Sequence, residues 1–212
     1  NEIAQSEGAT GKKWVNYWLH NEFLVIAKEK NEDGTEKDSG KMSKSSGNFL
    51  TLESLVEKGY DPLDYRFFLL GAHYRSQVAF SWPAMDSAKN ARKALVQRVA
   101  KVMEQAGITT LEETKKTILS EASLERLAKF REAMEEDLAT PRALSELQTA
   151  VKAADLEPEQ IIALVAKMDT VLGLDLINSA ISLNKEAKNI NTADSSTGDA
   201  EIDALVAERI EA

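Results

Sequence analysis

The sequence predicts a mainly α-helical protein whose C-terminal part is an antiparallel helical bundle. Apolar residues recur at three- and four-residue spacing through most of the chain after Ser81. Prolines and glycines fall near the ends of those segments, where helices begin and stop. The only clear strand signal is the short apolar run from Phe23 to Ala27.

The first 40 residues predict a helix, a strand and a hairpin. Residues 1–22 carry small and aromatic residues near the helical period, interrupted by Gly8 and Gly11. After the strand, Asp33-Gly34 lies in a charged stretch and is the usual signal of a two-residue hairpin turn, because both central positions of that turn favour positive φ.

Two short helices are predicted next. Thr51 is a typical N-cap, and Gly59 would end the helix that Thr51 begins. Asp61-Pro62 starts the second helix, since Asp caps an N-terminus and proline suits the first turn.

Four amphipathic helices with short connections follow and imply the bundle. Thr140-Pro141 and Glu157-Pro158 begin the third and fourth of them. The four apolar stripes are Ala88, Ala91, Leu95, Val99 and Val102; Leu127, Phe130, Met134 and Leu138; Leu144, Leu147 and Val151; and Ile161, Leu164, Val165, Met168 and Val171.

The segment from Asn178 to Ala200 is predicted to be a linker. It is rich in Asn, Ser, Thr, Asp and Lys, and its one apolar cluster, around Ile181 and Leu183, is too small to hold a core. Another amphipathic helix begins at Ile202, and we expect it to continue beyond Ala212.

Composition excludes several classes of site. The 212 residues contain no cysteine and two histidines, which rules out disulfides, a cysteine nucleophile and a zinc site built from this chain alone. A net charge of −9 argues against general attraction to nucleic acid but allows a local basic face. No apolar run approaches the roughly 20 residues of a membrane span, and no signal peptide is readable, so we expect a cytoplasmic protein cut from a longer chain.

The most specific feature is the stretch Gly40-Lys41-Met42-Ser43-Lys44-Ser45-Ser46-Gly47-Asn48. Two lysines three residues apart, with hydroxyls between and glycines around them, can bring positive charge onto a polyphosphate. When a carboxylate attacks an α-phosphate, negative charge builds on the departing pyrophosphate, and ammonium groups there stabilise the transition state. Without the particular residue order, the same stretch would be read as a solvated charged loop.

A second basic feature lies on the helix from Ala84 to Met103. Its cations outnumber its one acidic residue, Asp86, so an RNA phosphate contact is one reading and a solvated face is the other. These cations are Lys89, Arg92, Lys93, Arg98 and Lys101.

Several stretches, in order, resemble the cysteinyl-tRNA synthetases, a family of class I aminoacyl-tRNA synthetases. The lysine loop resembles the class I signature loop, and the similarity continues from the first residues into the last predicted bundle helix. The stretches are Asn-Glu-Ile-Ala-Gln-Ser at residues 1–6, Val-Asn-Tyr-Trp-Leu-His at 15–20, Lys-Met-Ser-Lys-Ser at 41–45, Ser-Gly-Asn-Phe at 46–49, Tyr-Arg-Phe-Phe-Leu-Leu at 65–70, His-Tyr-Arg-Ser at 73–76, Phe-Arg-Glu-Ala-Met-Glu-Glu-Asp at 130–137, Thr-Pro at 140–141 and Leu-Gly-Leu at 172–174.

The resemblance implies a division of the chain. Residues 1–50 would be the last part of a Rossmann-like α/β catalytic domain, and residues 51–80 a stem-contact element packing on the tRNA acceptor arm. Residues 81–176 would be a tRNA-binding helical bundle, residues 177–200 the linker and residues 201–212 the start of an anticodon-binding domain.

The resemblance also implies roles for four residues. Lys44 would contact ATP with help from Lys41, and Glu2 would be a zinc ligand whose two cysteine partners and histidine partner are missing from this chain. By the resemblance, His20 lies near the active-site wall and is a weaker candidate for the ATP site. Helical spacing alone predicts instead that His20 packs in the core with Trp14 and Trp18.

The expected function is therefore a part of a cytoplasmic, monomeric ligase that activates L-cysteine with ATP and transfers it to tRNA(Cys), with zinc in the complete protein. This chain alone is expected to be inactive. Two alternatives stay open: the cysteine ligase of mycothiol biosynthesis, which acylates an amino sugar, and a non-catalytic RNA-binding helical module.

Overall fold

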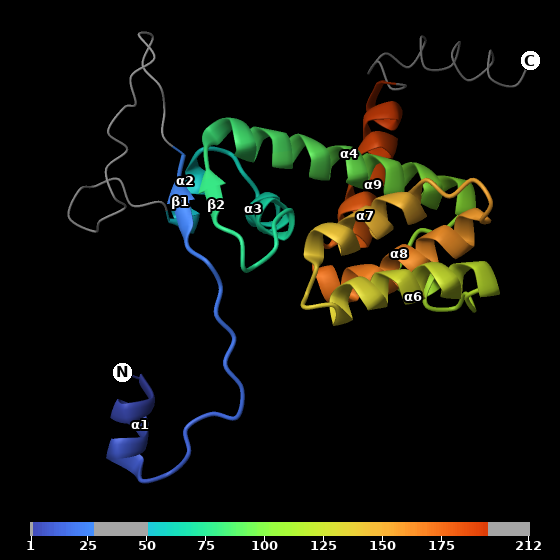
Figure 1. Ribbon diagram of the computed structural model, residues 1–212. Coiled ribbons are helices and arrows are strands. Elements are labelled where there is room, and N and C mark those ends of the chain that lie inside the picture. Colours follow the sequence, from blue (N-terminus) through green and yellow to red (C-terminus); the bar gives the residue numbers. More distant parts are fainter. Residues whose placement is uncertain (1, 28–50, 195–212) are drawn as a thin grey trace, which may run out of the picture.

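The computed structural model describes residues 2–27 and 51–194, which are mostly helical with one small parallel sheet (Figure 1). The elements are α1 Glu2–Thr10, β1 Leu24–Ile26, α2 Leu52–Glu57, α3 Pro62–Leu70, β2 Val78–Phe80, α4 Trp82–Ala106, α5 Leu111–Thr114, α6 Glu121–Glu135, α7 Thr140–Val151, α8 Pro158–Leu172 and α9 Leu176–Asp194.

The N-terminal segment is helical only in α1, so the prediction of a helix over residues 1–22 is wrong for its second half. The helix stops before Gly11, which has a φ of 65°, and the chain then runs without regular structure to β1. Figure 1 shows α1 standing apart from the other elements, and none of its residues is buried.

The predicted strand is present, and its partner comes from later in the chain. β1 pairs in parallel with β2, with Leu24 opposite Val78 and Ile26 opposite Phe80. Parallel strands need a crossover connection, and here α2 and α3 lie in it. The hairpin predicted at Asp33-Gly34 lies outside the described residues.

Both predicted short helices begin where expected. The hydroxyl of Thr51 accepts a hydrogen bond from the Ser54 backbone N–H, which closes a capping box at the start of α2. The Asp61 carboxylate accepts from Leu63 N, and Pro62 fills the first turn of α3. Together with β2 and the start of α4, these helices bury a small cluster of Leu55, Tyr60, Phe80 and Met85.

Helix α4 is the longest described element and passes through both hydrophobic clusters. Ser81 caps its N-terminus, and Gly107 ends it in the left-handed conformation. Met85 packs in the small cluster, whereas Val99 and Met103 belong to the main core. α4 thereby joins the sheet side of the protein to the bundle.

The main core lies where α4, α7, α8 and α9 meet, and α6 packs on α7 and α8 and adds Phe130 and Ala133 to it (Figure 1). The starts of α7 and α8 at Thr140-Pro141 and Glu157-Pro158 are confirmed. The most deeply buried large side chains of this core are Val99, Met103, Leu147, Ile162, Leu164, Val165, Met168, Leu172, Leu174 and Leu176.

The segment predicted as a linker from residue 177 is instead largely the helix α9, which packs against α4. Ile177 and Ala180 are buried in the main core, and Ile181 and Leu183 pack on it partly buried. The prediction was wrong because the apolar cluster around Ile181 and Leu183 was judged too small to hold a core. Together with Ile177 and Ala180 it completes a core that α4 and α8 already begin.

Candidate functional site

The lysine pair that carries the predicted nucleotide chemistry lies outside the described residues. Lys41 and Lys44 fall within residues 28–50. In sequence, this stretch lies between β1, which ends at Ile26, and α2, which begins at Leu52. The structure therefore gives only the place of the predicted loop in the sequence.

Glu2 is the first residue of α1, and its side chain is exposed. Within residues 2–27 and 51–194 no group of three or more His, Cys, Asp or Glu side chains could hold a metal ion. Glu2 therefore has no such metal-binding partners among the described residues, and the cysteine ligands that the resemblance implies are absent from the sequence.

His20 lies in the irregular segment before β1 and is exposed, so the prediction that it packs in the core is wrong. Its ring stacks on Trp18 at 5.7 Å with an interplanar angle of 3°, and Trp18 meets Trp14 edge-on at 5.3 Å. The three rings form a small exposed aromatic ladder, with Trp14 45% and Trp18 42% exposed.

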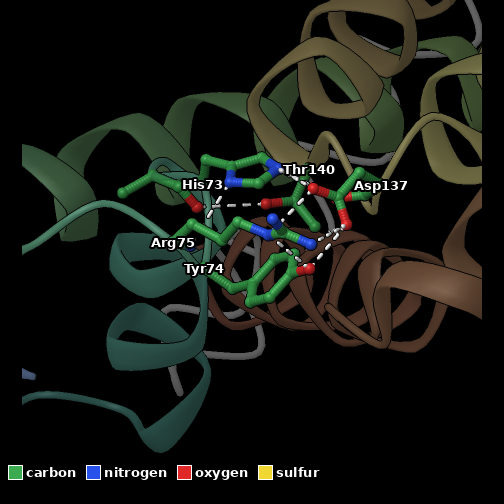
Figure 2. A network of polar contacts seen from close by, with 6 residues as sticks. His73, Tyr74, Arg75, Asp137 and Thr140 are labelled. Carbon is green, nitrogen blue, oxygen red and sulfur yellow. Dashed lines mark hydrogen bonds and ion pairs between the residues drawn. The ribbon is translucent and has the colours of Figure 1, made fainter. Parts of the chain in front are cut away.

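The best-defined polar cluster lies where the loop between α3 and β2 meets the turn between α6 and α7 (Figure 2). The Tyr74 hydroxyl donates to the Asp137 carboxylate at 2.5 Å, and Arg75 Nε lies 3.0 Å from the other oxygen of that carboxylate. The Nε2 atom of His73 lies 2.9 Å from the Asp137 carbonyl oxygen. Thr140 Oγ1 donates to the Ala72 carbonyl at 3.2 Å.

The Asp137 carboxylate and the Tyr74 hydroxyl stabilise the charged form of the Arg75 guanidinium. The hydrogen bond to the Tyr74 hydroxyl and the negative charge of Asp137 raise the pKa of Arg75 above its ordinary value. His73, Tyr74 and Arg75 belong to a stretch that carries the family resemblance, but the sequence did not identify Asp137 as their partner. The only sequence signal for this partner was the acidic residue Asp137 just before Thr140-Pro141. Its pairing with a loop more than 60 residues away cannot be read from residue spacing.

A cavity of about 410 Å³ lies beside this cluster. It opens between the start of β1, helix α3 and the first turn of α7. Polar groups that line it come from both the sheet side and the bundle: Asn21, Glu22, Arg66, His73, Ser76 and Thr140. The cavity therefore lies at the junction of the two parts of the fold.

The basic face predicted on α4 is smaller than the sequence suggested. Arg92 is buried, with NH1 3.3 Å from the Asp64 carboxylate, and Lys89 donates to the Gly59 carbonyl at 2.8 Å. Lys93, Arg98 and Lys101 remain exposed. The sequence placed Arg92 on the basic face and Ala91 in the apolar stripe of this helix. Both assignments were wrong, because the buried side of α4 includes Arg92 and not Ala91.

Comparison with known proteins decides the family. The profile described as the catalytic domain of class I (C) tRNA synthetases matches residues 1–90. A cysteine–tRNA ligase of Treponema denticola is 47% identical over 224 residues, covering all of this chain and 42% of that protein. The chain belongs to the cysteinyl-tRNA synthetase family.

Other members of the cysteinyl-tRNA synthetase family align over much of the chain. The cysteine–tRNA ligase of Treponema pallidum (strain Nichols) is 44% identical, covering 85% of this chain and 38% of that protein. The ligase of a Geobacter species is 37% identical, covering 100% of this chain and 44% of that protein. The chain spans about two fifths of the length of these relatives.

The family assignment supports the sequence resemblance beyond the lysine loop. The matched region 1–90 contains Lys41, Lys44, Glu2 and His20 as well as the His73-Tyr74-Arg75 segment. The alignments with whole relatives extend through the helical part. The amino-sugar ligase and the non-catalytic RNA-binding module, the two alternatives from the sequence, are not favoured by these matches. None of the described helices is long and apolar enough to span a membrane.

Proposed function

We propose that this chain forms part of a cysteine–tRNA ligase, which activates L-cysteine with ATP and transfers it to tRNA(Cys). The observation that carries the proposal is the 47% identity to a cysteine–tRNA ligase along the whole chain. In the first step the cysteine carboxylate attacks the α-phosphate, the bond to the β-phosphate oxygen breaks and pyrophosphate leaves. In the second, a terminal ribose hydroxyl of tRNA attacks the aminoacyl carbonyl, and AMP leaves.

In this proposal Lys44 and Lys41 act in the first step. Negative charge grows on the bridging and terminal oxygens of the departing pyrophosphate, and two ammonium groups there would lower the barrier without forming any covalent bond. Position supports this role, because in sequence the pair follows the carboxyl end of β1. His20 is a weaker candidate for the edge of the same nucleotide site.

Glu2 is proposed as a single zinc ligand whose partners come from outside this chain. The support is its place in the Asn-Glu-Ile-Ala-Gln-Ser stretch and its exposed side chain on α1. Since this chain does not fit a complete zinc site, no step of the reaction is assigned to the metal, and this chain alone is expected to be inactive.

The proposed roles of the segments keep the division that the sequence resemblance implies. Residues 1–50 would complete the catalytic domain, residues 51–80 would contact the acceptor stem, and the helical bundle of residues 81–176 would bind tRNA. The exposed cations Lys93, Arg98 and Lys101 support an RNA-facing side on α4. Residues 201–212 would begin an anticodon-binding domain, and the protein is proposed to be cytoplasmic and monomeric.

ATP–pyrophosphate exchange in the complete protein that contains this chain tests the proposal. The exchange should depend on L-cysteine and not on L-serine. Lys44→Ala should slow exchange by about a hundredfold or more, by analogy with removal of one oxyanion donor. Lys152→Ala is a matched control, because Lys152 is exposed at the end of α7, and it should stay within about twofold. Equal exchange in the Lys44→Ala variant and the unmodified protein would refute the role of Lys44.

A further inference from the structure

The turn between α6 and α7 has an unusual backbone. Asp137 has a φ of 52° and Leu138 a φ of 53°, so two consecutive residues with side chains adopt the left-handed conformation. Asp tolerates this conformation better than most residues, whereas Leu does not. Such strain persists only where the surroundings fix the conformation, and it is concentrated at functional positions.

The surroundings that fix this turn come from one loop far away in sequence. His73, Tyr74 and Arg75 all contact Asp137, at its carbonyl or its carboxylate (Figure 2). Next to them, Thr140 donates to the Ala72 carbonyl. Four consecutive residues of the loop therefore engage a single turn.

The contact joins the two parts of the fold at a further place. The loop with Tyr74 connects α3 to β2 on the sheet side, whereas the turn ends α6, which packs mainly on α7 and α8. Other connections run through α4, which reaches from the small cluster into the main core, and through α3, whose Phe67 is buried in that core and whose Arg66 donates to the Leu172 carbonyl. The contact at Asp137 adds a hold on the turn between α6 and α7, and a further point of attachment restrains the angle of the bundle more tightly.

We propose that Asp137 is a positioning residue that holds the helical bundle at a fixed angle to the sheet and α3, and so delivers the tRNA 3′ end to the nucleotide site. This inference rests on the proposed function. Asp137 does not touch the reacting atoms in this role. It acts through the 72–76 loop, which lies beside the start of β1 across the 410 Å³ cavity.

The two half-reactions should therefore respond differently. Adenylate formation needs no particular angle of the bundle, so Asp137→Ala in the complete protein should keep ATP–pyrophosphate exchange within about twofold. If only about one tenth of the variant molecules hold the bundle at the productive angle, kcat/KM for tRNA charging should fall about tenfold. Asp137→Asn, which tolerates the left-handed backbone and keeps an acceptor for Tyr74, should recover part of this loss.

Asp155→Ala is the matched control. Arg126 NH2 lies 2.7 and 2.8 Å from the two Asp155 carboxylate oxygens, so this is also a partly exposed Arg–Asp pair, but both residues belong to the bundle. Charging by Asp155→Ala should be unchanged. Equal loss of exchange and charging in Asp137→Ala, or equal charging in both variants, would overturn the positioning role.

A distance measurement tests the same idea without any activity. The chain has no cysteine, so spin labels can be placed through Glu57→Cys on α2 and Glu125→Cys on α6, both at exposed positions. The label–label distance should be narrowly distributed, and Asp137→Ala should broaden it. A narrow distribution in both proteins would refute the proposal. A broadened distribution in this chain, together with a complete protein that neither exchanges pyrophosphate nor charges tRNA, would refute the ligase function and leave the positioning role of Asp137 in the fold intact.

Discussion

Arg92 of α4 and Asp64 of α3 form an ion pair that is almost completely buried. NH1 of Arg92 lies 3.3 Å from Oδ1 of Asp64, and the two side chains are 10% and 5% exposed. NH2 of Arg92 also donates to the Leu174 carbonyl at 3.4 Å and to the Ser179 hydroxyl at 3.3 Å. The pair thus ties α3 and α4 to the start of α9.

Replacing Arg92 by Met should destabilise the protein strongly. Asp64 would remain buried without its countercharge, and breaking such a pair typically costs about 3–5 kcal/mol. Urea denaturation measures the loss. Lys93→Met on the next, exposed position is the control and should change the free energy of unfolding by less than about 0.5 kcal/mol. Similar values for the two variants would show that the pair contributes little.

Gly173→Ala should be more costly than Gly107→Ala. Both glycines end a helix in the left-handed conformation, with φ of 62° and 65°, and an added Cβ is disfavoured there by about 1–2 kcal/mol. At Gly173 the Cβ would also meet the Arg66 guanidinium at 3.2–3.4 Å, whereas at Gly107 it meets nothing within 4 Å. Arg66 Nε donates to the Leu172 carbonyl at 2.6 Å and therefore cannot move freely.

The extra cost at Gly173 can be isolated with a third protein. In an Arg66→Ala background, Gly173→Ala should cost only as much as Gly107→Ala, because the contact is gone. Thermal unfolding of the single and double variants supplies the comparison. The same penalty for Gly173→Ala with and without Arg66 would argue against steric conflict.

Ile177→Ala tests whether α9 is part of the core. Ile177 is 3% exposed, and truncating a buried Ile to Ala typically costs about 2–5 kcal/mol. Val171→Ala is the control, since Val171 is 51% exposed on α8, and it should cost less than about 0.5 kcal/mol. Chemical denaturation that finds Ile177→Ala as mild as the control would restore the interpretation of this segment as a linker.

Asp169 should make stability depend on pH. Burial raises the pKa of its carboxyl above the ordinary value of 3.8, although backbone N–H groups of Leu176 and Leu174 donate to it and oppose the rise. Because the folded pKa is above the unfolded one, the contribution of Asp169 to stability is fully present below the ordinary value and is lost as the pH rises through the raised pKa.

A comparison with Asp169→Asn isolates this group, since Asn does not titrate. The free energy of unfolding of the unmodified protein minus that of the variant should decrease as the pH rises from below 3.8 through the raised pKa of Asp169. Urea denaturation at several pH values gives this difference. An increase over the same range would mean that the two N–H donors outweigh burial.

Local sequence chemistry located the helix starts accurately. Thr51, Asp61, Thr140-Pro141 and Glu157-Pro158 all mark true N-termini. Capping depends on residues within one turn, so it can be read from neighbours in the sequence. The parallel pairing of β1 with β2 could not be predicted, because its partner lies more than 50 residues away.

Burial was harder to predict than helix position. The helical period placed Ala91 in the core, whereas the buried residue is Arg92, which an apolar pattern never selects. Trp14, Trp18 and His20 were expected in the core because of their helical spacing, and all three are exposed. In both places burial depends on other elements of the fold. Arg92 is buried because Asp64 supplies a buried countercharge. The aromatic rings are exposed because no element among the described residues covers them.

The sequence alone determined the family resemblance, the lysine pair that is proposed to meet ATP and the helices with their caps, because each depends on residue order or on contacts within one turn. Tertiary structure decided that α9 belongs to the core, that Arg92 is buried with Asp64 and that Asp137 receives three residues of a distant loop. These are contacts between surfaces that exist only after folding, so no spacing along the chain records them.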